Sequence, residues 1–234
     1  MNIGRRFLML LGTAFNVAAI ILGTMVGLTL KQRLPERMSS IAIQGLGLVT
    51  ALIGVKMMIT TENILVVLVS AVIGGILGEL LRIEARLDSF GARIEAKFSK
   101  EGGTFAKAFV TSSLLYCVGP MAILGALQDG LRGDFTILLT KSGLDGIASV
   151  AFASTLGIGV LFSALPVAAY QGGITIGASA LEPYLSSSMI NEMTATGGLL
   201  IVGIALNILQ VTKIRVGNLL PTILLAAILS AVVF

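Results

Sequence analysis

Long uncharged runs punctuate this chain of 234 residues. The runs are 7–30, 38–55, 63–81, 108–128, 146–181, 193–212 and 216–234, and their only charged residue is Glu79. A helix needs about 20 apolar residues to cross the hydrocarbon core of a bilayer, so six of the runs each fit one span. The run 146–181 has 36 residues with Pro166 near its middle, which predicts two spans. We therefore expect an all-α fold, a polytopic membrane helical bundle of about eight spans.

The composition agrees with a chain that is solvated by lipid. Hydrophobic residues make up 56% of the sequence and charged residues only 12%, whereas soluble domains average about 25% charged residues. The formal net charge is +4, but the 16 Lys and Arg residues are dispersed and form no basic patch interleaved with aromatic residues. The composition therefore indicates the lipid bilayer as a partner and excludes a nucleic-acid partner.

Cysteine and histidine usage limits the chemistry available to the chain. Cys117 is the only cysteine and histidine is absent, so no intramolecular disulfide, zinc site of ordinary type or serine–histidine triad can form. The carboxylates lie mostly in the connecting segments. We expect no enzymatic activity, no cofactor and no metal site.

The chain reads as one membrane domain over residues 1–234, with one substantial polar connection at 82–107. Apolar residues recur there at spacings of three and four, at Ile83, Leu87, Phe90, Ile94 and Phe98. This pattern predicts an amphipathic helix, either lying on the cytoplasmic membrane surface or extending the third span and packing on a partner. The first run exceeds the 7–15 apolar residues of a signal peptide, so we expect it to remain a span.

The distribution of basic residues predicts the orientation. Segment 31–37 carries three Lys or Arg residues, segment 82–107 carries six, and Lys213 and Arg215 lie in the last loop. All three segments fall on one side of an eight-span chain. By the positive-inside rule that side is the cytoplasm and both termini are outside. Arg5 and Arg6 are the exception, because this orientation places them outside as well.

A weak internal similarity predicts an inverted repeat. An offset of 96 residues pairs Gly23 with Gly119 and Met25 with Met121, and the matches continue in order along the chain. We assign 7–81 to the first repeat and 108–186 to the second. Each contains three spans, so the second copy enters the membrane from the opposite side, as in transporters that work by alternating access. The remaining helices at 193–234 form an accessory pair that packs around the bundle or provides a homodimer face.

Lys141 and Asp145 are the leading candidates for a solute or ion path. Their i, i+4 spacing places opposite charges on one helical face, where each lowers the cost of burying the other. They lie in 140–146, whose Thr, Ser and glycines are typical of a broken helix lining a cavity. The alternative is that the fifth span begins later and both residues lie in an interfacial loop.

Polar residues within other spans complete the candidate path. Gln44-Gly45 and Gln171-Gly172 occupy comparable places in the two repeats and offer a side-chain amide beside accessible backbone. Asn16 lies within the first span and also needs a polar partner. The alternative for the glycines is that they only allow close helix packing.

Three further polar residues near the C-terminus are assigned structural roles. Asn207 and Gln210 lie in the run 193–212, the expected seventh span, where we expect interhelical hydrogen bonds. Asn218 precedes the last apolar run and Pro221, as a helix cap would.

Both ends of the chain resemble a known family. The resemblance is carried by Gly12-Thr13-Ala14-Phe15-Asn16 with Gly23 and Gly27, and by Gly197-Gly198 through Asn207 to Arg215-Val216-Gly217-Asn218-Leu219-Leu220-Pro221. These residues are similar to the YdfK/YqgA-type family of bacterial integral membrane proteins of unknown function. The resemblance implies a multi-pass protein of the bacterial inner (plasma) membrane and supplies no catalytic or binding residue.

From the residues themselves we predict a membrane transporter that moves a small solute or ion by alternating access. An ion or solute channel would share the same polar path without alternating access. A non-transporting scaffold or partner-binding membrane protein is the third reading.

Overall fold

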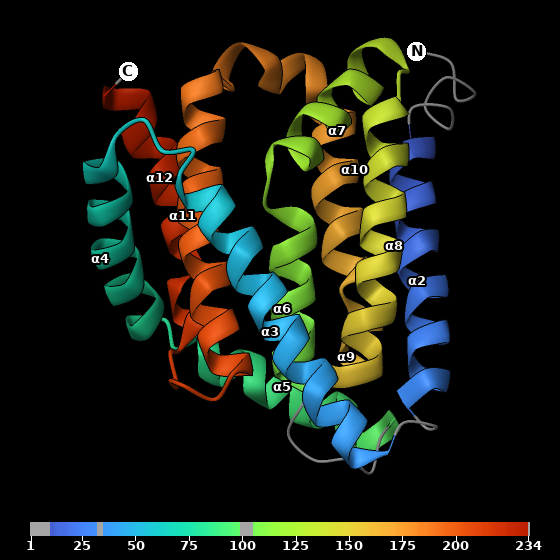
Figure 1. The fold of residues 1–234 in the computed structure, drawn as a ribbon. Helices are drawn as coiled ribbons and strands as arrows, with labels where there is room; N and C mark the ends of the chain where they lie inside the picture. The colour runs from blue at the N-terminus through green and yellow to red at the C-terminus, as the bar shows by residue number, and fades with distance from the viewer. Residues whose placement is uncertain (1–9, 32–34, 99–104, 234) are drawn as a thin grey trace. The chain divides into compact units, whose positions relative to one another are not determined.

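The computed structural model describes residues 10–31, 35–98 and 105–233, and these residues fold into helices joined by short turns (Figure 1). The α-helices are α2 (Leu11–Lys31), α3 (Glu36–Met58), α4 (Ile64–Leu80), α5 (Ile83–Phe98), α6 (Phe105–Cys117), α7 (Pro120–Arg132), α8 (Thr136–Leu156), α9 (Gly159–Phe162), α10 (Ala164–Leu181), α11 (Ser187–Ile208) and α12 (Pro221–Val233). Short 3₁₀ turns lie at η1 (Glu182–Tyr184) and η2 (Val216–Leu219). The described residues contain no strand, and the predicted all-α fold is confirmed.

The helix lengths also confirm the polytopic membrane class. Among the described residues, six helical segments are long and apolar enough to cross a membrane. Two bent pairs raise the number to eight if each pair is one span: α4 with the start of α5, bent by 53°, and α6 with α7, bent by 56°. The predicted count of about eight agrees with the upper number.

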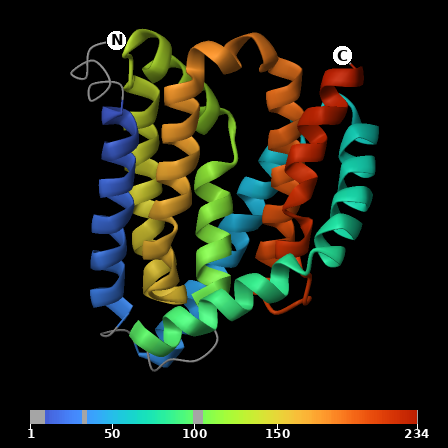
Figure 2. The ribbon, with the colours of Figure 1, turned by 180° about the vertical axis from the view of Figure 1, so that it is seen from behind.

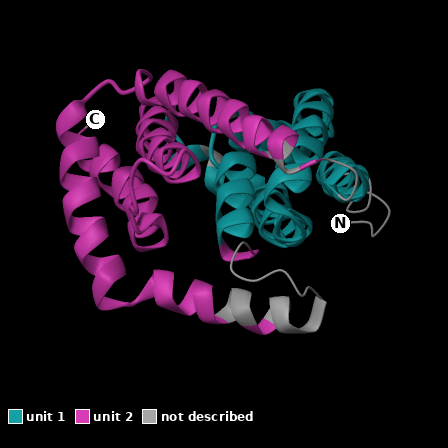
Figure 3. Ribbon diagram, turned by 60° about the horizontal axis from the view of Figure 1, so that its bottom comes forward, with its two compact units in different colours: residues 1–34, 107–186 teal, residues 35–106, 187–234 magenta. Residues whose placement is uncertain are grey.

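The chain divides into two compact units, coloured separately in Figure 3. Unit 1 comprises residues 1–34 and 107–186 and contains α2 and α6 to α10. Unit 2 comprises residues 35–106 and 187–234 and contains α3, α4, α5, α11 and α12. The units do not follow sequence order, because the first proposed repeat supplies α2 to unit 1 and α3 and α4 to unit 2. The repeat itself remains a prediction.

Unit 1 is organised around the close approach of α2 to α8, which lie side by side in Figures 1 and 2. Gly23 and Gly27 allow this approach. A Cβ on Gly23 would lie 2.2 Å from the carbonyl oxygen of Gly146, and one on Gly27 would lie 2.5 Å from that of Val150. Small residues four apart permit such backbone contact between membrane helices. Helix α10 packs on α7 and on α2, which completes the core of the unit.

The breaks in unit 1 do not lie where the sequence suggested. Helix α8 runs without interruption from Thr136 to Leu156, so the expected break at 140–146 is wrong. Gly143 and Gly146 keep helical backbone, and Gly146 serves as the contact point for α2. The chain breaks instead at Gly119, with φ of 140°, and at Gly157, with φ of 92°, conformations that only glycine adopts readily.

Unit 2 pairs α3 with α11 and α4 with α12. Gly54 and Gly198 meet at the first contact, where a Cβ on Gly198 would lie 2.7 Å from the carbonyl oxygen of Gly54. Gly74 lies against Thr222 at the second, with 2.7 Å between its Cβ position and the Thr222 nitrogen. The C-terminal pair therefore packs on the second and third spans.

A fully buried carboxylate joins α11 to the turn between α3 and α4. Glu192 accepts hydrogen bonds from the Glu62 amide at 2.6 Å, from the Asn63 amide at 2.9 Å and from the Thr61 hydroxyl at 2.8 Å. Its charge lies just before the N-terminus of α4, where an anion is stabilised. In the sequence Glu192 stands out only as the charged residue that precedes the uncharged run 193–212.

Glu62 makes the reciprocal contacts in the same turn. It accepts from the Asn191 amide at 2.6 Å and the Ser188 hydroxyl at 2.9 Å. These hydrogen bonds, first from Asn191 and then from Ser188, lower the pKa of Glu62. Two carboxylates thus fasten one end of unit 2.

At the opposite end of α4, Asn218 has a different role from the one predicted. It accepts from the Glu84 amide at 2.7 Å and donates to Glu79 at 2.7 Å, so it caps α5 rather than α12. Helix α12 begins at Pro221, which needs no amide donor there. Arg215 also pairs with Glu79, at 2.8 Å.

The expected interhelical role of Asn207 and Gln210 is also wrong. Asn207 bonds to Ile214 and Thr212 in the turn that follows α11. Gln210 is exposed in that turn with φ of 60°. Both residues therefore shape the helix end.

Helix α5 occupies most of the predicted connector 82–107. Ile83 and Leu87 are half-buried, whereas Arg82 and Arg86 are exposed and line a groove with Ala85, Ser89 and Arg93. The side chains of Phe90, Ile94 and Phe98 lie outside the described part. The helix is as predicted, and its place on the membrane surface remains a prediction.

Candidate functional site

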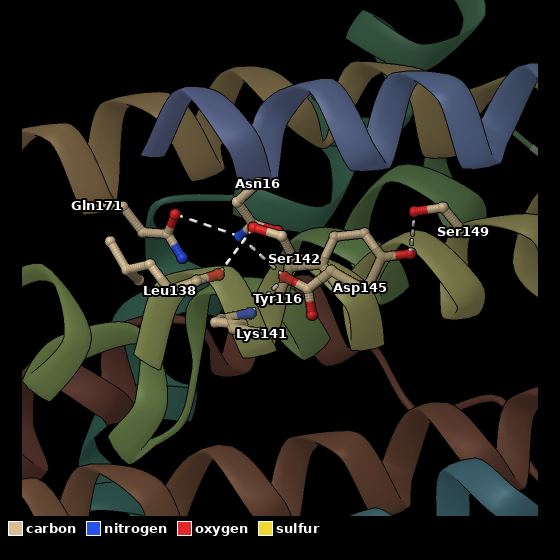
Figure 4. A network of polar contacts seen from close by, with 8 residues as sticks. All are labelled: Asn16, Tyr116, Leu138, Lys141, Ser142, Asp145, Ser149 and Gln171. Carbon is tan, nitrogen blue, oxygen red and sulfur yellow. Dashed lines mark hydrogen bonds and ion pairs between the residues drawn. The ribbon is translucent and has the colours of Figure 1, made fainter. Parts of the chain in front are cut away.

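Three membrane-length helices of unit 1 bring polar side chains together in a buried cluster (Figure 4). Helix α2 supplies Asn16, α8 supplies Lys141 and Asp145, and α10 supplies Gln171. Asn16 and Gln171 are 0% exposed, Lys141 is 6% exposed and Asp145 is 7% exposed. Four of the residues predicted from the sequence therefore meet in one place.

Lys141 and Asp145 form an ion pair within α8. The Lys141 ammonium donates a hydrogen bond to Oδ2 of Asp145, one turn further along the helix. The ammonium also lies 5.9 Å from the centroid of the Tyr116 ring, within reach of a cation–π interaction. Both residues are helical and buried, so the alternative location in an interfacial loop is wrong.

The Asn16 amide links the ion pair to α10. Its Nδ2 donates to Oδ2 of Asp145 at 3.0 Å and to Oε1 of Gln171 at 3.2 Å. The carboxylate accepts only, and this fixes the Asn16 amide with its nitrogen toward Asp145. Gln171 must then present its oxygen to Asn16. The Asn16 side chain therefore links α2 to both α8 and α10.

Two polar atoms in the cluster have no hydrogen-bond partner. They are Oδ1 of Asn16 and Nε2 of Gln171, one acceptor and one donor. Buried amide groups in proteins are nearly always paired, because an unpaired one costs about 1–3 kcal/mol. The cluster thus retains the capacity to bind a further polar group.

Sequence reasoning missed the second polar contact of α8. Ser149 lies one turn beyond Asp145, and its hydroxyl is hydrogen-bonded to that of the fully buried Tyr116 at 2.8 Å. The spacing of Lys141, Asp145 and Ser149 continues one polar stripe along the helix, and this stripe was the available signal. Tyr116 on α6 gave no comparable signal, since it lies alone in an apolar run.

The two Gln-Gly segments lie in different surroundings. Gln44 and Gly45 are on α3 in unit 2, where both are exposed and a Cβ on Gly45 would meet no atom within 4 Å. The cluster described within unit 1 is built without them. Gly172 is buried beside Gln171, and a Cβ there would meet Leu10 at an ordinary 3.7 Å. Neither glycine is required by a close backbone contact.

Comparisons with known proteins assign the chain to a family. The model of a family described as "Protein of unknown function (DUF554)" matches residues 11–231. The chain belongs to the DUF554 family. This confirms the resemblance inferred from the two ends of the sequence.

Two curated relatives cover nearly the whole length of this DUF554 chain. "Uncharacterized membrane protein YdfK" of Bacillus subtilis (strain 168) is 34% identical over 228 residues, which is 95% of this chain and 96% of the relative. "Uncharacterized protein YqgA" of Escherichia coli (strain K12) is 31% identical over 228 residues, which is 95% of this chain and 97% of the relative. No solved structure is similar enough to be matched.

The cluster of this DUF554 chain gathers several kinds of polar group. It combines a cation, an anion, two amides and the Tyr116–Ser149 hydroxyl pair on membrane-length helices. Within the described ranges, no group of three or more His, Cys, Asp or Glu side chains could hold a metal ion. The groups of the cluster offer hydrogen bonding and charge recognition.

Proposed function

We propose that this protein moves a small solute or ion across the membrane, with Asn16, Lys141, Asp145 and Gln171 forming the binding path. The observation that carries the proposal is the buried ion pair joined to two amides on three helices of membrane length. Ionisable side chains within spans are costly, and in membrane proteins they usually mark a transport path or a relay.

The unpaired atoms of Asn16 and Gln171 favour a ligand site over a purely structural network. A network that only holds helices together gains most when every member is satisfied. A ligand offering one donor and one acceptor would satisfy both atoms. Asp145 and Lys141 would then set the charge that the ligand can carry.

Alternating access is the mechanism that we propose, and it rests on the sequence repeat of 7–81 and 108–186. Two inverted copies can exchange conformations around a site near the middle of the bilayer. The proposal predicts that residues 13–81 superpose on 109–179 after a rotation of about 180° around an axis in the membrane plane. An experimental structure in which the two halves run parallel would remove this mechanism.

We place the protein in the bacterial inner (plasma) membrane, because both curated relatives are bacterial and one is named as a membrane protein. The proposal assigns it no catalysed reaction and no cofactor. A homodimer through the C-terminal helix pair remains part of the proposal.

The test begins with ligand binding. Purified protein is screened by thermal shift against amino acids, organic acids, polyols and alkali-metal salts, because a ligand of the native state raises its apparent stability. Each compound that binds is then tested for flux in proteoliposomes. We expect flux with the wild type, loss of flux with Asp145→Asn, and normal flux with Asp134→Asn, a control at an exposed carboxylate.

The same flux data separate the alternatives. Saturation with rising solute concentration supports a carrier, and flux that does not saturate supports a channel with the same path. Equal flux through the wild type and Asp145→Asn would reject the assigned path. Absence of flux for every compound that binds would favour the scaffold reading.

A further inference from the structure

Asp129 is a second buried carboxylate of unit 1. It lies near the end of α7, is 0% exposed, and neither of its carboxylate oxygens has a hydrogen-bond partner. Asp145 by contrast accepts from both Lys141 and Asn16. Burying an ionised carboxylate without partners is very costly, whereas the protonated form is neutral and costs far less.

The start of α2 lies beside the Asp129 carboxylate. A Cβ on Gly12 would lie 2.9 Å from Oδ2 of Asp129 and 2.7 Å from Cδ1 of Leu138, so Gly12 of α2 lies close to both side chains. The Gly12 amide lies close enough to act on it electrostatically, but without normal hydrogen-bond geometry. This amide favours the ionised carboxylate, whereas burial without a hydrogen-bond partner favours the protonated one.

Among the described residues, no charged group on the elements packed against Asp129 forms an ion pair with it. Those of the packed helices are Lys31 of α2, the Lys141–Asp145 pair of α8, Tyr170 of α10, and Arg132 and Asp134 beside Asp129. Lys141 is already paired, Lys31 lies at the other end of α2, and Arg132 and Asp134 are exposed. Asp129 makes no ion pair among the described residues.

Unused polar atoms connect Asp129 with the Asp145 cluster. Thr13 and Asn16 lie one turn apart on α2, and Gln171 and Thr175 lie one turn apart on α10. All four are buried and each has a side-chain atom without a partner. Asn16 and Gln171 are joined by a hydrogen bond at one end of this line.

The other end of the line reaches the backbone around Asp129. Gly12, which precedes Thr13, contacts its carboxylate, and a Cβ on Gly130 would lie 2.2 Å from the Thr175 carbonyl oxygen. Helices α2 and α10 therefore both lead from the Asp145 cluster to the segment carrying Asp129.

We propose that Asp129 binds and releases a proton, and that Thr13, Asn16, Gln171 and Thr175 connect it with the Asp145 cluster. This rests on the proposed transport function and names the proton as its coupling ion. On binding, a proton forms an O–H bond with one carboxylate oxygen, and the charge of Asp129 is lost. On release, the O–H bond breaks and the proton passes to a neighbouring acceptor.

A proton fits this site better than a sodium ion does. A sodium ion requires several oxygen ligands in place of its hydration shell, whereas a proton requires a single carboxylate oxygen. The described part of the chain gathers no group of three or more His, Cys, Asp or Glu side chains that could hold a metal ion.

Infrared difference spectroscopy tests the proposal without a known solute. The full-length protein in phosphatidylethanolamine–phosphatidylglycerol vesicles is titrated with acid and base in potassium buffer. We expect a carboxylic-acid C=O band that appears and disappears reversibly in the wild type and is lost in Asp129→Asn. Asp134→Asn, at an exposed carboxylate, should retain the band. Asp129→Glu should retain a band at a shifted position, which covers the case in which Asp129→Asn does not fold.

The connection from Asp129 to the Asp145 cluster is tested by the rate of hydrogen–deuterium exchange at the Asp129 carboxyl group. Thr175→Val and Gln171→Leu should slow the shift of the band after transfer to heavy water by at least about tenfold, while the band itself remains. If Asp129 only caps α2 and stays ionised, the wild type will show no such band. If the band persists in Asp129→Asn, it belongs to another carboxyl group. Either result overturns the proposal. So does a band that sodium chloride removes at constant pH, because Asp129 would then be a sodium site.

The two proposals can fail separately. If the Asp129 band titrates but no compound shows flux, the transport proposal fails and the proton site stands. If Asp145→Asn abolishes flux but no band depends on Asp129, the proton site fails and the solute path stands.

Discussion

Replacing Lys141 with Met should destabilise the protein more than most single substitutions. Lys141 is 6% exposed, and its removal leaves Asp145 with the Asn16 amide at 3.0 Å as its remaining described partner. Removing one partner of a buried ion pair costs about 3–5 kcal/mol, because an uncompensated charge stays behind. At about 1.4 kcal/mol per tenfold, this lowers the ratio of folded to unfolded protein by roughly 10² to 10³·⁵.

Asp145→Asn should cost somewhat less. The amide keeps one oxygen for Asn16, and the Tyr116 ring 5.9 Å from the Lys141 ammonium offers partial compensation of about 0.5–2 kcal/mol. The double variant Lys141→Met with Asp145→Leu removes both charges. It should recover most of the loss, since apolar replacement of a whole buried pair is often neutral or stabilising.

The proteins are unfolded in mixed detergent micelles. The midpoint and the free energy of unfolding are measured for the wild type, both single variants and the double variant. The double-variant cycle yields the coupling energy of the pair. A coupling below about 0.5 kcal/mol, with losses in the single variants that simply add, would show that Lys141 and Asp145 do not hold each other in the membrane. The buried ion pair would then be an incorrect description of α8.

The remaining predictions concern packing, capping, pH and orientation. Gly23→Ala places a Cβ 2.2 Å from a carbonyl oxygen of α8 and should lower the free energy of unfolding by about 1–3 kcal/mol. In the control Gly143→Ala the new Cβ meets no atom within 4 Å, so this variant should be neutral or stabilised by up to about 1 kcal/mol. Glu192→Gln should cost about 2–3 kcal/mol, because its three donors lose a charged acceptor; equal melting temperatures would contradict this. Hydrogen bonds from Asn191 and Ser188 lower the pKa of Glu62 below its ordinary value of 4.5. The ionised Glu62 therefore stabilises the fold above that pH, and this contribution is lost as the pH falls through the pKa of the folded state. Glu62→Gln should accordingly flatten the acid side of a plot of melting temperature against pH. A reporter active only in the cytoplasm, fused to the C-terminus, should be silent, and a strong signal would reverse the predicted orientation.

The helix boundaries were the most predictable part of the fold. The run 7–30 became α2 at Leu11–Lys31, and 193–212 lies largely within α11 at Ser187–Ile208. Charges avoid the hydrocarbon region, so uncharged runs mark spans wherever the loops are short and charged. The rule says nothing of the geometry inside a run. The run 108–128 was predicted as one span, and the chain bends within it between α6 and α7.

Glycine breaks could not be assigned from the sequence, because glycine both interrupts helices and lets them pack closely. Gly119 and Gly157 adopt positive φ and break the chain, whereas Gly143 and Gly146 continue α8. The neighbouring residues do not separate the two roles, since Gly119 and Gly157 lie in apolar sequence and Gly143 and Gly146 lie beside Lys141 and Asp145. At Gly146 the glycine allows close packing against α2, and such a contact between distant segments is a property of the tertiary structure.

The candidate site was predictable only where its contacts are local. Lys141 and Asp145 are one turn apart, so their pairing follows from helix geometry. Asn16 and Asn207 looked alike, each an asparagine in an apolar run. Asn207 finds partners five and seven residues along the chain, whereas the partners of Asn16 lie 129 and 155 residues away.

This difference in sequence separation distinguishes a local turn from a site whose hydrogen bonds change when helices move. The hydrogen bonds of Asn207 with Thr212 and Ile214 lie within one connection and persist when helices move as rigid bodies. Those of Asn16 cross from α2 to α8 and to α10, so any shift between these helices breaks or re-forms them. A sliding of α2 along the glycine contact at Gly23 would therefore change the hydrogen bonding of Asp145 directly, which is the coupling between helix movement and ligand binding that a carrier requires.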